Sequence, residues 1–280
     1  MSRFKKFTTD KIWVVTGAGK GLGRELALLA ARNHGIVWAL DRDEVALASL
    51  LEDAKRNGWD IFTQNLDVTD SEQATSVLDA IVRSSKRVDV WINNAGIQRV
   101  GSFLGMKSSD FDLVMDVNFN SVVQLTRKVL AQMDQQGCGV ILNMASAAGH
   151  VPSPFMSAYV AAKHAVVGFS KSLQAELTIS KSPVRVAFAS PGFVDTAIIE
   201  RGKDQGFPEW LSWMLSRPEE CASEILMKLA KGENEIYPTL SGKLLRKAYT
   251  VAPLTTVRGS KLLLTKGLKD FLLNRYQVPR

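Results

Sequence analysis

The stretch Lys11–Asn33, KIWVVTGAGKGLGRELALLAARN, decides how this chain folds. An apolar run ending at Thr16 leads into a glycine-rich turn, and helix-forming residues follow at once. This order predicts a strand, a tight turn and a helix. The backbone amides of the turn and the N-terminus of the helix suit a pyrophosphate group. The turn reads T-G-x-x-x-G-x-G rather than the general G-x-G-x-x-G fingerprint, and ordinary strand–helix turns also contain glycines.

The alternation of apolar strand and helical run continues along the chain. Further strands are expected at residues 35–40, 60–65, 88–92, 140–143, 184–189 and 235–238. Strands that alternate with helices predict an α/β fold, here a single Rossmann-type, doubly wound parallel sheet with helices on both faces. Ligands of such sheets bind outside the carboxyl ends of the strands. The residues expected at those ends include Gly17, Asp41, Asp67, Asn94 and Ser146.

Asp41 bears on the choice of cofactor. It follows the second expected strand, where a carboxylate can accept hydrogen bonds from an adenosine ribose 2′-hydroxyl and would repel a 2′-phosphate. It could instead be only an acid at the start of the next helix. Lys20 and Arg42 favour the opposite cofactor, because either could pair with a 2′-phosphate. We expect NAD, with NADP as the alternative.

Ser146, Tyr159 and Lys163 form a candidate catalytic set. The spacing of four places Tyr159 and Lys163 on one face of a helix. A nearby ammonium favours the phenolate and should lower the tyrosine pKa. Ser146, at the end of a neighbouring strand, can present a hydroxyl to the same point, so the set could polarise a carbonyl or take a proton from an alcohol. The pair could also be an ordinary half-buried tyrosine beside a solvated lysine.

Residues 111–134 read as one long amphipathic helix with Asn118 in its interior. Asparagine lowers helix propensity there and is usually a satisfied polar residue. It could instead hold a water near Lys163.

These residues together resemble the short-chain dehydrogenase/reductase family, in its compact one-domain branch. The motifs occur in the family's order from about residue 10 to 235. They are TGAGKGLG at 16–23, Asp67, NNAG at 93–96, Asn118, Ser146, YVAAK at 159–163 and PGFVDT at 191–196.

The resemblance implies a role for each matching position. Tyr159 would be the general acid/base, Ser146 would hold the substrate oxygen, and Lys163 would bind the nicotinamide ribose and lower the tyrosine pKa. Asn118 would keep a water in the proton relay. With the residues weighed above, the expected cofactor-binding set is Gly17, Lys20, Gly21, Leu22, Gly23, Asp41, Arg42, Asp67, Val68, Asn94, Ala95, Gly96, Tyr159, Lys163, Pro191, Gly192, Val194 and Thr196.

The expected activity is hydride transfer between NAD(P) and an apolar secondary alcohol or ketone. The apolar preference rests on the segment 193–217, which is rich in Ile, Leu, Phe and Trp, although a helix packed on the body would explain this too. The alternative is an NAD(H)-sensing binding protein that reports redox state to a partner. The complete catalytic set argues against a sensor, which needs only the nucleotide cleft. The resemblance also implies a homo-oligomer, formed through the helices at 111–134 and 155–179.

Composition narrows the other classes. Two cysteines and three isolated histidines offer no metal-ligand cluster, and they favour a reducing, cytoplasmic setting. No secretory signal or membrane-spanning helix is expected. The net charge of +7 is concentrated at the end, because residues 241–280 hold nine Lys/Arg and one Asp. The rest is near neutral, so nucleic-acid binding is not expected.

We expect a catalytic domain over 1–240 and a basic amphipathic helical extension over 241–280. Leucines among well-spaced cations are compatible with contact to an anionic membrane surface. Docking on the chain's own body, on a neighbouring subunit or on an acidic protein would also explain this pattern.

Overall fold

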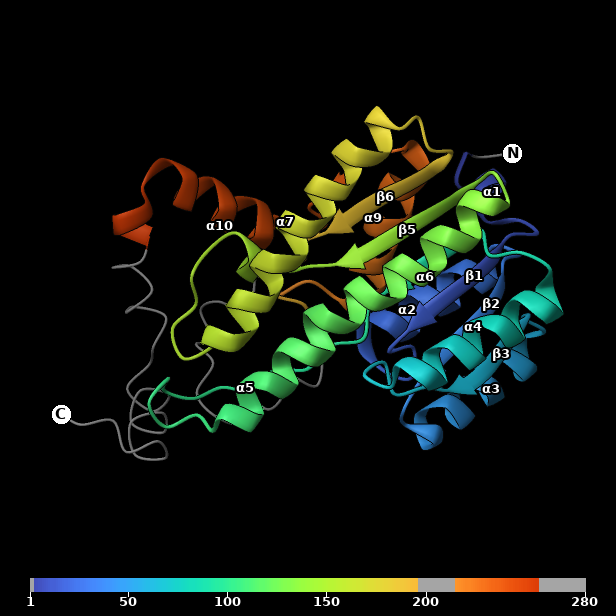
Figure 1. Cartoon of the computed structure of the whole chain (residues 1–280), viewed down its shortest axis with the longest axis horizontal. Helices are drawn as coiled ribbons and strands as arrows, with labels where there is room; N and C mark the ends of the chain where they lie inside the picture. The colour runs from blue at the N-terminus through green and yellow to red at the C-terminus, as the bar shows by residue number, and fades with distance from the viewer. Residues whose placement is uncertain (1–2, 196–214, 257–280) are drawn as a thin grey trace.

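The computed structural model describes residues 3–195 and 215–256. Its centre is a seven-stranded, wholly parallel sheet in the order β3-β2-β1-β4-β5-β6-β7, which confirms the doubly wound α/β fold (Figure 1). The strands are β1 (Ile12–Thr16), β2 (Ile36–Asp41), β3 (Ile61–Asn65), β4 (Val90–Asn93), β5 (Gly139–Met144), β6 (Val184–Ala189) and β7 (Glu235–Ile236).

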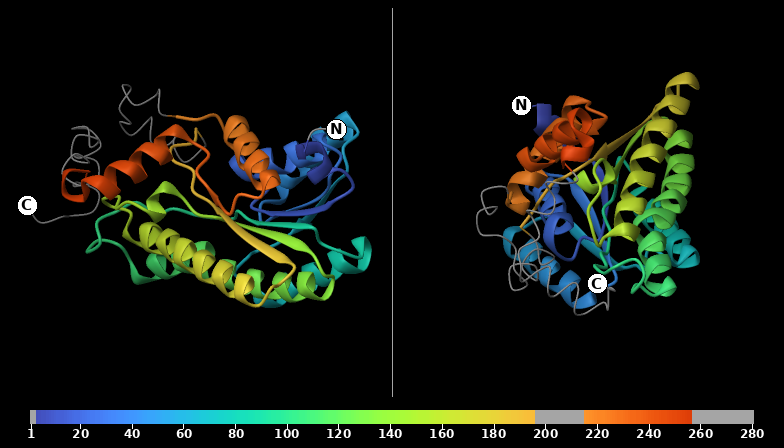
Figure 2. Two further views of the ribbon diagram at one scale, coloured as in Figure 1. Left: turned by 90° about the horizontal axis from the view of Figure 1, so that it is seen from above. Right: turned by 90° about the vertical axis from the view of Figure 1, so that its left-hand side faces the viewer.

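Helices cover both faces of the sheet (Figure 2). One layer holds α1 (Arg3–Thr8), α2 (Gly21–Arg32), α3 (Glu44–Asn57) and α9 (Pro218–Lys231), and the other holds α4 (Ser71–Ser85), α6 (Ser121–Gln135) and α7 (Ser157–Ile179). Successive strand residues point to opposite faces. Trp13 and Val15 therefore join the core on the α2 side, whereas Val14 joins the core beneath α4 and α6. This two-sided burial explains why β1 is apolar throughout.

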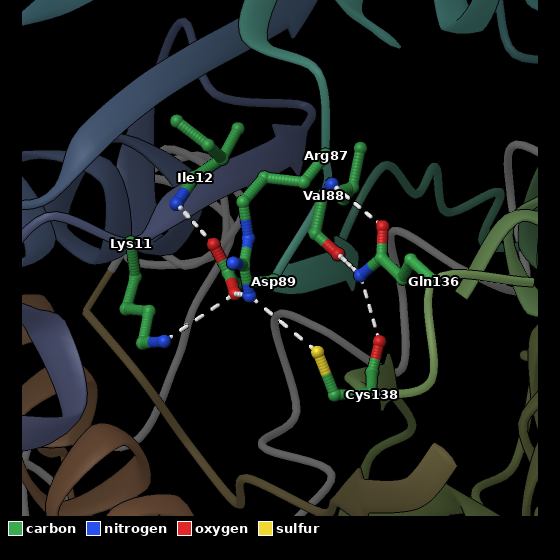
Figure 3. Close-up of polar contacts among 7 residues, drawn as sticks. All are labelled: Lys11, Ile12, Arg87, Val88, Asp89, Gln136 and Cys138. Atoms are coloured by element: carbon green, nitrogen blue, oxygen red, sulfur yellow. Dashed lines mark hydrogen bonds and ion pairs between the residues drawn. The ribbon is translucent and has the colours of Figure 1, made fainter. Parts of the chain in front are cut away.

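Side chains tie the strands together at their amino ends (Figure 3). The buried carboxylate of Asp89 accepts a hydrogen bond from Ile12 N at 2.9 Å and pairs with Arg87. Gln136 Nε2 donates to Val88 O at 2.5 Å, and Gln136 Oε1 accepts from Val88 N at 3.2 Å. These contacts fix the starts of β1 and β4.

The helix expected over 111–134 is present, but it contains a π-helical turn that was not predicted. Helix α5 (Ser108–Met115) passes into a π-helical turn, η1 (Asp116–Asn120), before α6 begins. Asn118 lies in that turn, where its Nδ2 donates to Val114 O and Ile97 O, both at 2.8 Å. Single π turns inside helices are frequent at functional sites.

Helix α10 (Leu240–Val251) follows β7 and lies beyond the carboxyl ends of β5 and β6 (Figure 1). It begins at Leu240, one residue before the extension expected over 241–280. Residues 257–280 of that extension, and 196–214 of the apolar-rich segment 193–217, lie outside the described residues. Within the described ranges, none of the helices has the length and hydropathy needed to cross a membrane.

Candidate active site

The turns after β1 and β4 meet where the strand order reverses. β2 and β3 extend the sheet on one side of β1, and β4 begins the other side, which makes this a topological switch point. Asn94 Nδ2 donates to Thr16 O at 3.0 Å and to Gly17 O at 3.1 Å. Asn94 N and Ala95 N donate to Thr16 Oγ1 at 3.0 and 3.1 Å. The NNAG segment and the glycine turn are thus one unit, held by a threonine that was not in the predicted set.

The glycines of the turn are required by its geometry. Gly17 has φ +65°, in the region that favours glycine. A Cβ on Gly23 would lie 2.1 Å from Gly17 O and 2.3 Å from Asn94 Nδ2. Helix α2 begins at Gly21, so its free N–H groups lie beside this tight turn. The arrangement fits a pyrophosphate.

Asp41 stands at the end of β2 and faces the same turn. Its Oδ2 accepts from Gly19 N at 2.8 Å, and its Oδ1 accepts from Asp43 N at 3.0 Å. Lys20, one of the two cations that could have favoured a 2′-phosphate, instead pairs with Asp43 at 2.6 Å. Arg42 is exposed. The Asp41 carboxylate is therefore held toward the glycine turn, and Lys20 is paired with Asp43 beside it.

Asp67 and Val68 follow β3, next to the end of β2. The hydroxyl and backbone amide of Thr69 donate to Asp67 Oδ1 at 2.7 and 2.9 Å, and these bonds lower the pKa of the carboxyl. Val68 is buried. A charged acceptor and an apolar wall beside the cradle are suited to an adenine ring.

Ser146, Tyr159 and Lys163 come together as predicted. Ser146 follows β5, and the other two project from α7. The Tyr159 side chain hydrogen-bonds with that of Ser146. Lys163 Nζ lies 5.6 Å from the centroid of the Tyr159 ring and donates to Met144 O at 2.8 Å. A proton-transfer group, a hydroxyl and an ammonium therefore share one site.

The pKa of Tyr159 differs from the expectation. Burial raises the pKa of the phenol, and the hydrogen bond with Ser146 acts in the opposite direction. The prediction of a lowered tyrosine pKa is thus wrong for the chain by itself, because loss of hydration outweighs the favourable contacts. Burial also lowers the pKa of Lys163, to about 8.

Asn118 contributes a free acceptor to this site. Its Oδ1 is buried and accepts no hydrogen bond from the residues that the structure describes. A Cβ on Gly96 would lie 2.9 Å from this oxygen and 3.8 Å from Lys163 Nζ. Since buried polar atoms are normally paired, the oxygen fits a further polar group between the amide and the ammonium.

The segment after β6 is held by the start of α10. Gly192 N donates to Thr239 Oγ1 at 2.8 Å, and Phe193 N donates to Ser241 Oγ at 3.1 Å. A Cβ on Gly192 would lie 2.4 Å from Gly242 N. Sequence reasoning missed this link, because it treated the residues after 240 as an addition to the domain.

The other residues expected on this segment are only partly placed. Pro191 O accepts from Ala147 N at 2.7 Å, next to Ser146, and Val194 forms a bridge with Ser216. Thr196 lies outside the described residues.

A buried polar network supports α7, the helix that carries Tyr159 and Lys163. Asn93 Nδ2 donates to Asn143 Oδ1 at 2.8 Å and to Thr126 Oγ1 at 3.0 Å, and Asn143 Nδ2 donates to Ser170 Oγ at 3.0 Å. These bonds join β4, β5, α6 and α7. The signal was present in the sequence, since an asparagine lies at or next to the end of each of two otherwise apolar strands, but the pairing of the two could not be read from it.

Metal ligands do not gather in the described part of the chain, where no three His, Cys, Asp or Glu side chains could hold one ion.

Known proteins are similar to this chain over most of its length. The model of the short chain dehydrogenase family matches residues 11–205. SadH of Mycobacterium tuberculosis is 34% identical over 241 residues, which cover 83% of this chain and 87% of SadH. The 3-oxoacyl-(acyl-carrier-protein) reductase FabG of Thermotoga maritima is 33% identical over 228 residues, which cover 80% of this chain and 92% of FabG.

Solved structures are similar as well. A short-chain type dehydrogenase/reductase from Mycobacterium marinum has a TM-score of 0.78 and 27% identity, with 85% of this chain and 98% of that one covered. A short chain dehydrogenase/reductase from Burkholderia phymatum, in complex with NAD, has a TM-score of 0.76 and 25% identity, with 90% and 96% covered.

Proposed function

This chain belongs to the short-chain dehydrogenase/reductase family of oxidoreductases, and from that premise we propose that it transfers a hydride between NAD and an apolar secondary alcohol or ketone. Family members act on hydroxyl or ketone groups with a nicotinamide cofactor. The observation that carries the proposal is the contact of Tyr159 with Ser146 beside the buried Lys163 ammonium.

Each catalytic side chain has a distinct task in the proposed mechanism. Ser146 donates to the substrate oxygen and holds it against Tyr159. In oxidation the Tyr159 phenolate removes the hydroxyl proton, and in reduction the phenol returns it. The nicotinamide, when bound, supplies or accepts the hydride. The Lys163 ammonium favours the phenolate, and Asn118 Oδ1 accepts a hydrogen bond along the route by which the proton leaves.

NAD is the cofactor we propose, with NADP as the alternative. The residues that would hold it are the glycine turn, the NNAG segment and Asp41. Support comes from the direction of the Asp41 carboxylate and from the pairing of Lys20 with Asp43. A 2′-phosphate near Asp41 would face a like charge, and of the two candidate cations only Arg42 would be available to it.

An apolar substrate is supported by the loop between β4 and α5. Phe103 is 69% exposed and Leu104 is 84% exposed on this loop. The loop is held to the segment that enters α7, because Gly101 N donates to Phe155 O at 2.8 Å. Apolar side chains therefore lie exposed near the start of the helix that carries Tyr159. FabG, a relative, acts on an acyl chain by its name.

Assembly into a homo-oligomer through α6 and α7 is a further part of the proposal. Phe119, in η1 just before α6, and Phe169, in α7, are only half-buried and pack edge to face, with ring centroids 6.3 Å apart. Light scattering of Phe169→Glu against the natural chain would test it, and an unchanged mass would remove this surface from consideration.

One substitution distinguishes the enzyme hypothesis from the sensor hypothesis. Tyr159→Phe removes the acid/base group, so turnover should fall by about 10²–10⁴-fold, whereas NAD affinity by calorimetry should stay nearly the same. Turnover is followed by nicotinamide absorbance with a panel of apolar alcohols and ketones, with NAD(H) and NADP(H) in parallel. Near-normal turnover of the variant would contradict the assigned mechanism. Tight nucleotide binding without turnover across the panel would favour the sensor.

A further inference from the structure

Helix α10 carries an exposed apolar stripe. Leu240 is 59% exposed, Leu244 44% and Val251 77%. Their spacings of four and seven place all three on one side of the helix. Leu254, just after the helix, is 72% exposed. Exposed apolar groups that gather on one face indicate a contact surface, whereas scattered ones do not.

Cations lie along the edge of this stripe. Lys243 and Lys247 each follow a stripe leucine by three residues, and both are exposed. Neither forms an ion pair with a residue in the ranges 3–195 and 215–256. The sequence from 240 to 256 contains no Asp or Glu. The exposed side of α10 therefore combines the apolar stripe with the two cations Lys243 and Lys247 along its edge.

The opposite side of α10 is anchored, so the orientation of the helix is fixed. Leu245 and Tyr249 are half-buried against the body. Arg246 lies 4.3 Å from the centroid of the Tyr237 ring, so this third cation is already engaged. The Thr239 hydroxyl caps the helix by accepting from Gly242 N at 3.1 Å.

We propose that α10 docks the protein on an anionic lipid bilayer. An amphipathic helix with Lys/Arg beside an apolar stripe lies in the plane of the interface, where the stripe enters the acyl boundary and the cations meet anionic headgroups. A second copy of the chain fits this surface less well, because it would bring a second α10 of the same positive charge close to the first, with no Asp or Glu between 240 and 256 to pair with it. Charge complementarity therefore selects the anionic surface.

The docking places the active site near the bilayer. The residues that begin α10 also hold the segment after β6, through Gly192 N and Phe193 N. Docking thus sets that segment close to the lipid phase, from which an apolar alcohol or ketone could enter. This consequence rests on the proposed function, but the docking itself does not.

Flotation of the full chain with vesicles tests the docking. One set of vesicles is phosphatidylcholine alone, and the other is an equal mixture with phosphatidylglycerol. The natural chain should float with the mixed vesicles and not with the neutral ones. Lys243→Glu with Lys247→Glu, and Leu244→Ser with Val251→Ser, should each reduce the bound fraction at constant lipid by about tenfold or more.

Matched controls keep the test specific. Lys55→Glu with Lys231→Glu gives the same net charge as the α10 charge variant, from exposed lysines on α3 and α9. Ile179→Ser with Val45→Ser removes two apolar side chains that are 82% and 81% exposed. Both controls should float like the natural chain, and thermal unfolding should show that every variant is folded.

Four results would overturn the docking proposal. The natural chain could fail to float with anionic vesicles, or float equally with neutral ones. Alternatively, both α10 variants could float like the controls, which would place any lipid contact elsewhere in the chain. Binding only to an acidic protein would likewise reject the lipid surface. Turnover is not part of this readout, so failure of the proposed activity would leave the flotation result unaffected.

Discussion

The Lys163 ammonium lies 5.6 Å from the centroid of the Tyr159 ring and is almost fully buried at 4% exposure. A phenol, which is neutral when protonated, thus shares a site of little water with an ammonium, which is charged when protonated. Burial disfavours the charged form of each, so it raises the pKa of Tyr159 and lowers the pKa of Lys163 to about 8. Both shifts can be tested.

The Ser146 hydroxyl opposes the rise in the tyrosine pKa. Ser146→Ala should therefore raise the pKa of Tyr159 further. Alcohol oxidation needs the phenolate, so its rate should begin to increase at a higher pH in this variant. The pH profile of kcat measures the shift. Ser153→Ala, a serine in the loop before α7, is the control and should leave the profile in place. An unchanged profile in the Ser146 variant would contradict its contact with the phenol.

Lys163 should make the stability of the chain depend on pH. Its pKa is about 8 in the folded state, against the ordinary lysine value of 10.5, so the unfolded chain binds more protons between these pH values. The free energy of unfolding should therefore rise with pH across this window, by at most roughly 3 kcal/mol. The cost of burying the charge is fully present below pH 8.

A comparison of the natural chain with Lys163→Met isolates the contribution of Lys163 to this pH dependence. Lys163→Met lacks the titrating group, so its unfolding free energy should lack this increase. Urea titrations of both proteins at several pH values from 7 to 10.5 measure it, without added nucleotide. Parallel pH dependences of the two proteins would show that Lys163 does not titrate in this window.

Gly23 has no room for a side chain, since a Cβ would lie 2.1 Å from Gly17 O. Gly23→Ala should therefore force the turn apart, destabilising the fold by about 1–3 kcal/mol and weakening NAD binding. Gly168→Ala is the matched control. Gly168 is an exposed residue of α7 with no atom within 4 Å of the added methyl group, and alanine there should be neutral or stabilising by up to about 1 kcal/mol. Equal effects of the two substitutions would contradict the close packing of the turn.

The sequence was sufficient for the sheet and for the residues at its carboxyl edge. Parallel strands buried on both sides must be apolar, and a polar residue or a glycine ends or closely follows β1, β2 and β5, so Gly17, Asp41 and Ser146 could be placed without coordinates. The Tyr159–Lys163 pair could be placed because helical spacing is local. Local pattern is thus enough where the chain order itself determines which groups meet.

Contacts between distant segments could not be predicted in this way. Gly192 and Thr239 are 47 residues apart, and nothing in either segment marks the other as its partner. The π turn at Asn118 could not be predicted either, because the sequence of the segment is equally compatible with an uninterrupted α-helix. The predicted direction of the shift in the Tyr159 pKa was wrong for a related reason. The shift depends on burial by residues that the Tyr159–Lys163 spacing does not reveal.

Asp41 should determine the preference for NAD. Its carboxylate faces the nucleotide cradle through Gly19 N, where it can accept from a ribose 2′-hydroxyl and would repel a 2′-phosphate. Asp41→Ser keeps a hydrogen-bonding oxygen and removes the charge. The ratio of kcat/KM for NAD to that for NADP should therefore fall by about 10–100-fold, as expected for a charge-assisted hydrogen bond worth about 1.5–3 kcal/mol.

Asp60 supplies the control for the Asp41 substitution. Asp60→Ser removes an exposed carboxylate just before β3 and should leave the ratio unchanged. Calorimetry with each nucleotide separates a change in binding from a change in turnover. If the natural chain prefers NADP, Arg42 outweighs the repulsion by Asp41. In that case Arg42→Ala should lower NADP affinity, whereas Lys20→Ala should have the smaller effect, because Lys20 is already paired with Asp43 at 2.6 Å.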